Sequence, residues 1–168
     1  ENAKNNPLTI SAKNLSFSYK GASDIVIKNA NFQVKSGETV GIIGSSGEGK
    51  TTMLRLILGL VNPMEGEITF SNETQTLKAS MSTRRLCSYV LQVNSILCGT
   101  VAENLRLVKP DATDDEIIEI LKLAGAWKFV SRLPKGINSE ISERNNNLSE
   151  GQAQRISIAR ALLRNAPV

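Results

Sequence analysis

The stretch VGIIGSSGEGKTT, residues 40–52, decides the fold. Its β-branched start predicts a strand over residues 40–43, and the apolar pattern from Met53 to Leu60 predicts a helix. The loop between them fits G-x-x-x-x-G-K-[ST], in which glycines let consecutive backbone N–H groups curl around an anion at a helix N-terminus. A chance glycine turn is the alternative, but both required flanks are present. The stretch therefore predicts a phosphate-binding loop.

Three side chains at the end of this loop have roles that the phosphate chemistry suggests. Lys50 would reach the β- and γ-phosphates as a mobile positive charge. Thr51 would hold Mg²⁺ through its hydroxyl, and Thr52 would add a hydrogen bond to the α-phosphate.

Length and composition favour one globular domain, with 168 residues of which 40% are hydrophobic. The net charge of +4 is spread along the chain, which argues against nucleic-acid binding. Cys87 and Cys98 are isolated, so we interpret them as reduced structural thiols of a cytosolic protein. The absence of histidine excludes any mechanism that needs an imidazole from these residues. No apolar run is long enough to cross a bilayer, so a membrane role would need a span supplied elsewhere.

The order of patterns along the chain predicts strands first and helices later. Alternating apolar residues predict antiparallel strands over 8–10, 15–19, 25–27 and 31–34, and further strands over 67–70 and 87–92. Residues 93–168 are predicted to be mostly helical. Capping boxes at Thr100–Glu103 and Thr113–Glu116 would open two of these helices.

Two isolated residues are candidates for contact with a nucleotide. Tyr19 ends a predicted strand, where an exposed aromatic ring could stack on a purine base; a tyrosine packed on the sheet is the alternative. Gln92 ends another predicted strand, and ligands of open α/β sheets meet such carboxyl ends. An uninvolved surface glutamine is the alternative there.

The segment LSEGQAQR, residues 148–155, enters a helix with Ser149 as N-cap and Gln152 three residues later. Helix initiation alone would explain the serine and the glutamine. It does not explain Gly151, which weakens a first helical turn unless a ligand must approach the backbone closely.

Together these motifs resemble the ATP-binding cassette, the nucleotide-binding domain of ABC transporters. The loop resembles the family's Walker A motif, Tyr19 its adenine-stacking aromatic, Gln92 its Q-loop glutamine, and residues 148–152 its signature motif. Residues 99–104 and 139–144 are similar to segments of exporter-type cassettes. The implied fold is an α/β P-loop NTPase core with an antiparallel β-subdomain and Walker A strand over 8–43, a core over 44–92, and a helical subdomain over 93–168.

The resemblance implies an ATPase that couples ATP binding and hydrolysis to export, with ATP and Mg²⁺ as cofactors. It further implies a head-to-tail dimer with a second nucleotide-binding domain, transmembrane domains as partners, and a place on the cytoplasmic face of the membrane. Lys50 and Gln92 would be catalytic, and Thr51 and Gln92 would hold the metal. The implied nucleotide-binding residues are Tyr19, Gly44, Ser45, Ser46, Gly47, Glu48, Gly49, Lys50, Thr51, Thr52, Ser149, Glu150, Gly151 and Gln152.

Three departures from the family pattern lead to further expectations. Glu150 replaces the usual glycine, and its carboxylate would repel a γ-phosphate, which predicts a weakened or asymmetric site. Glu48 places a carboxylate in the phosphate loop, where turning outward toward an arginine would relieve it. The sequence reaches Val168 before the family's Walker B strand, catalytic glutamate and switch histidine, so these residues alone are expected to hydrolyse little ATP.

Two other classes of protein compete with the transporter ATPase. A nucleotide-binding regulatory module that dimerises without turnover would tolerate Glu48 and Glu150. A DNA-repair or chromosome-organising ATPase would carry a long coiled coil between the phosphate loop and the signature. Only about a hundred compact residues without heptads lie there, which disfavours that class.

Overall fold

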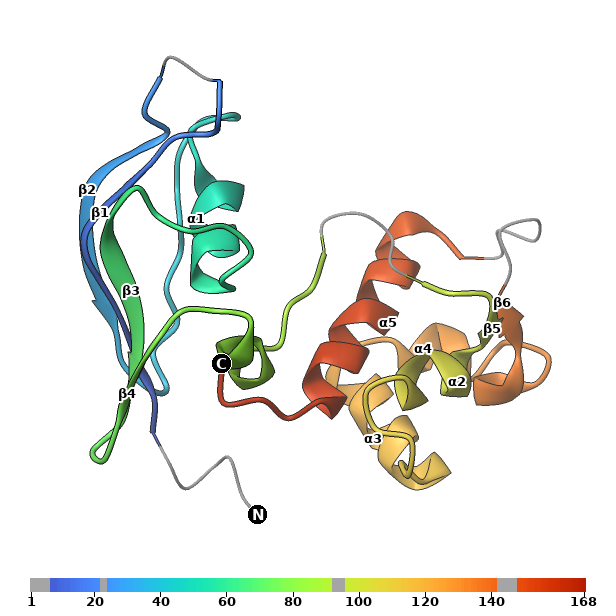
Figure 1. Ribbon diagram of the computed structural model, residues 1–168. Helices are drawn as coiled ribbons and strands as arrows, with labels where there is room; N and C mark the ends of the chain where they lie inside the picture. The colour runs from blue at the N-terminus through green and yellow to red at the C-terminus, as the bar shows by residue number, and fades with distance from the viewer. Residues whose placement is uncertain (1–6, 22–23, 92–95, 142–147) are drawn as a thin grey trace. The chain divides into compact units, whose positions relative to one another are not determined.

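The computed structural model describes residues 7–21, 24–91, 96–141 and 148–168 of the chain (Figure 1). Its contacts divide into two compact units. The first, the sheet unit, comprises residues 1–87 with 167–168, and the second, the helical unit, comprises residues 88–166.

The sheet unit contains a four-stranded antiparallel sheet in the order β2-β1-β3-β4. The strands are β1 (Thr9–Phe17), β2 (Ile27–Val34), β3 (Glu65–Ser71) and β4 (Thr76–Lys78). The strands predicted over 8–10 and 15–19 join into the single strand β1, whose pairing with β2 shifts register after Ala12. A shift of this kind is a bulge, which lets one strand continue through residues that break the alternation.

One face of this sheet forms the core of the unit together with α1 (Lys50–Ile57) and the residue that follows it. The helix begins where the glycine loop ends and contributes Leu56, which is 2% exposed. The buried apolar side chains of this core are Ile10, Ala12, Leu15, Phe17, Ile27, Leu56, Leu58, Ile68, Phe70 and Cys87. A 3₁₀ turn, η2 (Ser82–Leu86), completes the unit and accepts a hydrogen bond from the amide of Val168 at the carbonyl of Leu86.

Two strand predictions are wrong. Residues 40–43 and residues 87–91, the described part of the strand predicted over 87–92, have no regular secondary structure and belong to no sheet. Ile43 is 96% exposed, and Val40 and Ile42 line a hollow of about 630 Å³ beside α1 and β2. Apolar β-branched residues favour a strand only where a neighbouring strand accepts their backbone hydrogen bonds. Within the part of the chain that the structure describes, neither segment has such a neighbour.

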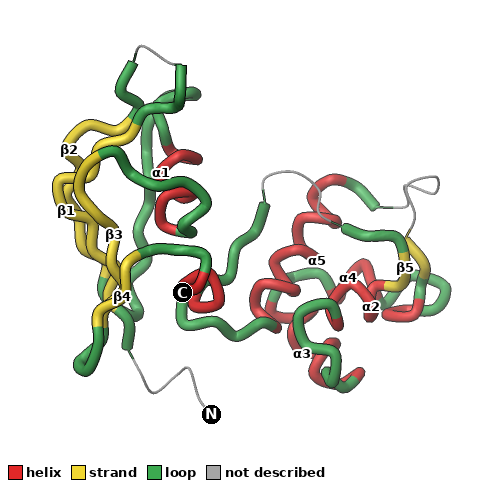
Figure 2. Tube along the Cα trace, viewed as in Figure 1, coloured by secondary structure: helices red, strands yellow, loops and turns green. Residues whose placement is uncertain are grey.

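The helical unit holds most of the helices, as Figure 2 shows. They are α2 (Val101–Arg106), α3 (Asp114–Leu123), α4 (Trp127–Val130), the 3₁₀ turn η3 (Gly136–Asn138) and α5 (Glu150–Leu163). A two-stranded sheet pairs β5 (Gly99–Thr100) with β6 (Glu140–Ile141). The core comprises Val101, Ala102, Leu105, Ala112, Ile117, Leu121, Ala126, Val130, Ile137, Ile156, Ala159 and Leu163.

The predicted capping boxes of α2, α3 and α5 are confirmed. Each N-cap hydroxyl accepts from the N3 amide, and each N3 side chain accepts from the N-cap amide. These reciprocal bonds satisfy N–H groups that a helix start leaves without partners. None of the described helices is long and apolar enough to cross a membrane.

Candidate nucleotide-binding site

The glycine loop takes the backbone shape that the motif requires. Gly47 and Gly49 have φ values of 88° and 89°, in the left-handed region that residues with a Cβ rarely adopt. A Cβ at Gly49 would also lie 3.1 Å from the carbonyl oxygen of Val26. Gly47 is therefore needed for its backbone angle. Gly49 is needed for its backbone angle and because it lies against the carbonyl oxygen of Val26, just before β2.

Lys50, the first residue of α1, folds its side chain back over this loop. Its ammonium group donates to the carbonyl oxygen of Gly44 at 2.8 Å and to that of Ser45. Because an ammonium group has three donors and carbonyl oxygens are neutral acceptors, an arriving phosphate can replace either carbonyl with a stronger, charge-assisted bond. The loop thus presents a positive charge at the start of α1.

Glu48 turns inward. Its carboxylate accepts a 2.6 Å hydrogen bond from the amide of Ser45, within the same loop, so the expected outward rotation toward an arginine is wrong. A side chain three residues along can close a turn onto the backbone amide behind it, as the capping boxes of this chain do.

The two threonines that follow Lys50 have different surroundings. Thr51 is exposed, so its hydroxyl is accessible to a ligand or metal. Thr52 is 5% exposed, and its hydroxyl lies 3.0 Å from the hydroxyl of Tyr19. The structure therefore brings Tyr19 to the helix that starts at the phosphate loop.

Tyr19 lies two residues beyond β1 and is 37% exposed. Its ring meets the ring of Phe17 edge to face, with centroids 4.9 Å apart, and Arg55 donates to its hydroxyl at 3.1 Å. The hydrogen bond with Thr52 lowers the pKa of the Tyr19 phenol, partial burial opposes this change, and Arg55 lowers the pKa further. Sequence reasoning missed Arg55, although it is three residues after Thr52 and so lies on the same side of α1.

The predicted signature residues begin α5 in the helical unit. Ser149 is the N-cap, and its hydroxyl accepts from the amide of Gln152 at 3.3 Å. Glu150 is exposed in the first turn, and a Cβ on Gly151 would meet nothing within 4 Å. Among the described residues, no neighbour requires glycine at position 151. Gln92 lies outside the described residues.

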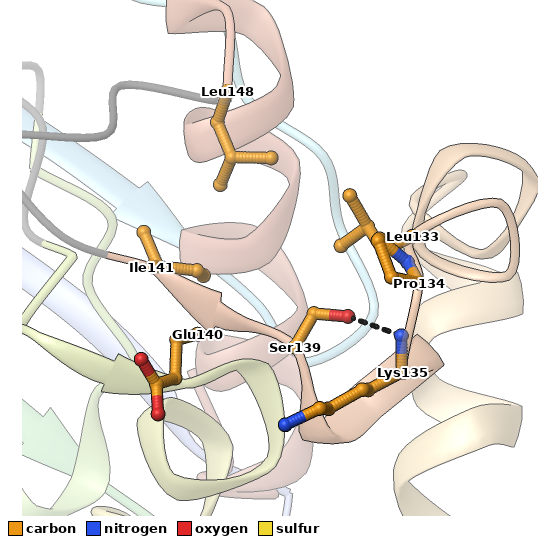
Figure 3. Close-up of a pocket in the computed structure, with 7 residues that line it drawn as sticks. All are labelled: Leu133, Pro134, Lys135, Ser139, Glu140, Ile141 and Leu148. Carbon is orange, nitrogen blue, oxygen red and sulfur yellow. Dashed lines mark hydrogen bonds between the residues drawn. The ribbon is translucent and has the colours of Figure 1, made fainter.

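A separate hollow of about 230 Å³ lies in the helical unit (Figure 3). It is lined by Leu133, Pro134, Lys135, Ser139, Glu140, Ile141 and Leu148. Between two of these lining residues, the amide of Lys135 donates to the hydroxyl of Ser139 at 3.0 Å. Leu148 of the predicted signature motif lines this hollow, whereas residues 149–152, which are predicted to contact nucleotide, do not.

The chain is similar to known proteins in both sequence and structure. The family model for ABC transporters matches residues 27–168. A putative export ATP-binding/permease protein of Rickettsia conorii is 40% identical over 159 residues, which are 94% of this chain and 28% of that protein. The alpha-hemolysin translocation ATP-binding protein HlyB of Escherichia coli is 37% identical, over 95% of this chain and 22% of its own length.

Among solved structures, a bacterial Atm1-family ABC exporter with ATP bound matches with a TM-score of 0.83 and 31% identity. The match covers 96% of this chain and 28% of that one, so this chain spans about a quarter of the length of these relatives. The fold is the ABC ATPase fold, mixed α/β with an antiparallel sheet. With the family model matching most of its residues, the chain belongs to the ABC transporter family.

Proposed function

We propose that this chain is the ATP-binding part of an exporter-type ABC transporter whose parent protein couples ATP binding and hydrolysis to transport. The geometry of the phosphate loop carries this proposal. Gly47 and Gly49 turn the backbone, and the Lys50 ammonium group lies over the loop on carbonyl oxygens that phosphate can replace. The export proteins among its relatives support the direction of transport.

Within this site, residues 44–52 would hold the phosphates and Tyr19 would stack on the adenine. Lys50 would neutralise charge on the β- and γ-phosphates. Gln92, the second catalytic and metal-binding candidate, would complete the site from the segment after residue 91. The predicted subdivision into residues 8–43, 44–92 and 93–168 belongs to the same proposal.

The described side chains fit a Mg²⁺ ion that takes most of its ligands from a bound nucleotide and water. The described residues contain no group of three or more His, Cys, Asp and Glu side chains that could hold a metal. Mg²⁺ commonly takes one or two protein ligands and fills its remaining positions with phosphate oxygens and water. The exposed hydroxyl of Thr51 suits such a role, and the metal would supply charge neutralisation to the phosphates.

The start of α5 supports a head-to-tail dimer with a second nucleotide-binding domain. Residues 149–152 offer a helix N-terminus with Ser149 as its N-cap and a glycine that has nothing within 4 Å of its Cβ position, which is suited to a γ-phosphate bound by the partner domain. Transmembrane domains would complete the transporter and would place this domain on the cytoplasmic face of the membrane.

Calorimetric titration of the purified protein with MgATP tests this function. We expect Lys50→Ala to weaken binding by at least tenfold, since it removes the cation that faces the phosphates. Lys35→Ala is the matched control, because Lys35 is an exposed lysine of the same unit in the turn after β2. Absence of MgATP binding by the unmodified protein, or equal loss in both variants, would contradict the proposal.

A degenerate cassette that binds nucleotide without turnover is the second candidate, and Glu150 favours it. Its exposed carboxylate lies in the first turn of α5, beside the position where a γ-phosphate would bind. Glu150→Gly in the complete transporter would then increase ATP affinity or turnover by removing like-charge repulsion. If neither increases, Glu150 does not impair the site.

A further inference from the structure

Three side chains beside the phosphate loop form a hydrogen-bonded group: Arg55, Tyr19 and Thr52. The Arg55 guanidinium donates to the Tyr19 hydroxyl at 3.1 Å, and this hydroxyl lies 3.0 Å from the Thr52 hydroxyl. Thr52 and Arg55 are three residues apart on α1, so both face the same ring. Phe17 contacts the ring edge to face at 4.9 Å.

The bonding capacities of the three groups allow both contacts at once. A guanidinium group can only donate, so the Tyr19 oxygen is the acceptor toward Arg55. The single phenol proton is then available to the hydroxyl of Thr52, which is nearly buried at 5% exposure. Loss of Arg55 would leave the phenol with one partner on α1 in place of two.

Tyr19 is 37% exposed, so the orientation of its ring depends on its contacts with Arg55, Thr52 and Phe17. A tyrosine side chain that is already held loses little rotational freedom when a flat ligand stacks on it. The same side chain, when free to rotate, must be ordered by the ligand at a cost in affinity. The hydrogen bond from Arg55 to the Tyr19 hydroxyl should therefore raise the affinity of ligands that stack on the Tyr19 ring.

From this geometry we propose that Arg55 is a positioning residue for the nucleotide base, acting through the orientation of Tyr19. The proposal rests on the proposed function, in which Tyr19 stacks on adenine and residues 44–52 hold the phosphates. It predicts a selective effect. Affinity for a ligand with a base depends on Arg55, whereas affinity for a phosphate chain without a base does not.

The test compares calorimetric titrations of the purified protein with MgATP and with magnesium tripolyphosphate. We expect Arg55→Met to weaken MgATP binding roughly three- to tenfold and to leave tripolyphosphate binding within about twofold. Arg55→Lys retains a donor and should recover part of the MgATP affinity. Arg85→Met is the matched control, because Arg85 is an exposed arginine of the same unit, on η2.

A double-mutant cycle separates positioning from general damage to the fold. Tyr19→Phe keeps the ring and removes the hydroxyl, so Arg55→Met should add little further loss in that background. Equal loss for both ligands, or an undiminished Arg55→Met effect in Tyr19→Phe, would overturn the proposal. If the unmodified protein binds tripolyphosphate and ATP equally, the base contributes nothing and the proposal also fails. If it binds neither, the proposed function fails first.

Discussion

The Glu48 carboxylate accepts a 2.6 Å hydrogen bond from the amide of Ser45, so a negative charge is anchored inside the phosphate loop. The bond closes the loop before any ligand is present. The charge also opposes a phosphate: at about 6 Å and an effective dielectric near 20, two unit charges repel by about 3 kcal/mol, and solvent at this exposed site reduces that value. Glu48 therefore supports the shape of the loop, and its charge is expected to lower the affinity of the loop for phosphate.

Replacing Glu48 with glutamine separates these two effects. The amide oxygen of Glu48→Gln can keep the bond to Ser45 while the negative charge is removed, so we expect MgATP to bind roughly two- to fivefold more tightly. Calorimetric titration measures the change. Glu38→Gln is a matched control, because Glu38 accepts from the amide of Lys35 in the same way, at 2.7 Å, outside the loop.

Unchanged or weaker MgATP binding in Glu48→Gln would show that the negative charge of Glu48 does not repel the bound phosphates. Glu48→Ala removes both the negative charge and the hydrogen bond to Ser45, whereas Glu48→Gln removes only the charge. A weaker binding in Glu48→Ala than in Glu48→Gln would measure what the bond contributes to holding the loop in shape.

Among the described glycines of the sheet unit, Gly66 has the closest neighbouring backbone. Its φ is 74°, and a Cβ there would lie 2.2 Å from the carbonyl oxygen of Lys13 on β1. We expect Gly66→Ala to lower the free energy of unfolding by about 2 kcal/mol or more, because backbone strain and a backbone clash act together. Chemical denaturation followed by circular dichroism checks this value.

Gly37→Ala isolates the strain from the clash. Gly37 has a similar φ of 82°, yet a Cβ there would meet nothing within 4 Å. Its replacement should therefore cost only about 1 kcal/mol, the typical penalty for the left-handed region alone. Equal effects in the two variants would mean that β1 moves freely away from position 66.

Features that depend on residues close in the sequence were predictable. The capping boxes at Thr100, Thr113 and Ser149 join residues three apart, and the structure contains all three. The phosphate loop follows in the same way from glycine spacing, because left-handed angles at Gly47 and Gly49 are a local property of the backbone.

Features that depend on distant residues were not predictable. The strand predicted over 40–43 needed a neighbouring strand, and local propensity contains no information about one. Arg55 has its partner Tyr19 at a separation of 36 residues, so spacing within α1 could only place it beside Thr52. The inward turn of Glu48 was missed for a different reason. The bond from Ser45 to Glu48 joins residues three apart and is local, but a carboxylate in the loop was expected to turn outward toward an arginine.

The ion pair of Lys109 with Glu116 predicts a pH dependence of stability in the helical unit. The two side chains approach to 2.7 Å, next to the capping box that begins α3. The hydrogen bond from Lys109, followed by that from the amide of Thr113, lowers the pKa of Glu116 below its ordinary value of 4.5. The hydrogen bond to Glu116 raises the pKa of Lys109 above its ordinary value of 10.5.

The two shifts place the loss of stability at opposite ends of the pH range. A lowered carboxyl pKa stabilises the fold above pH 4.5, and this contribution is lost as the pH falls through the folded value. A raised lysine pKa stabilises the fold below pH 10.5, and this contribution is lost as the pH rises through the folded value. Between these limits the contribution of the pair is constant.

Lys109→Met removes the pair and its pH dependence. The difference in unfolding free energy between the unmodified protein and this variant should be constant near neutral pH and shrink as the pH falls through the lowered pKa of folded Glu116. Urea denaturation followed by the fluorescence of Trp127 measures it. Lys122→Met, an exposed lysine in the last turn of α3, is the control. The side chains of Lys109 and Glu116 are 37% and 44% exposed, so the effect is small. A difference that stays constant until the protein unfolds in acid would show that the pair contributes nothing.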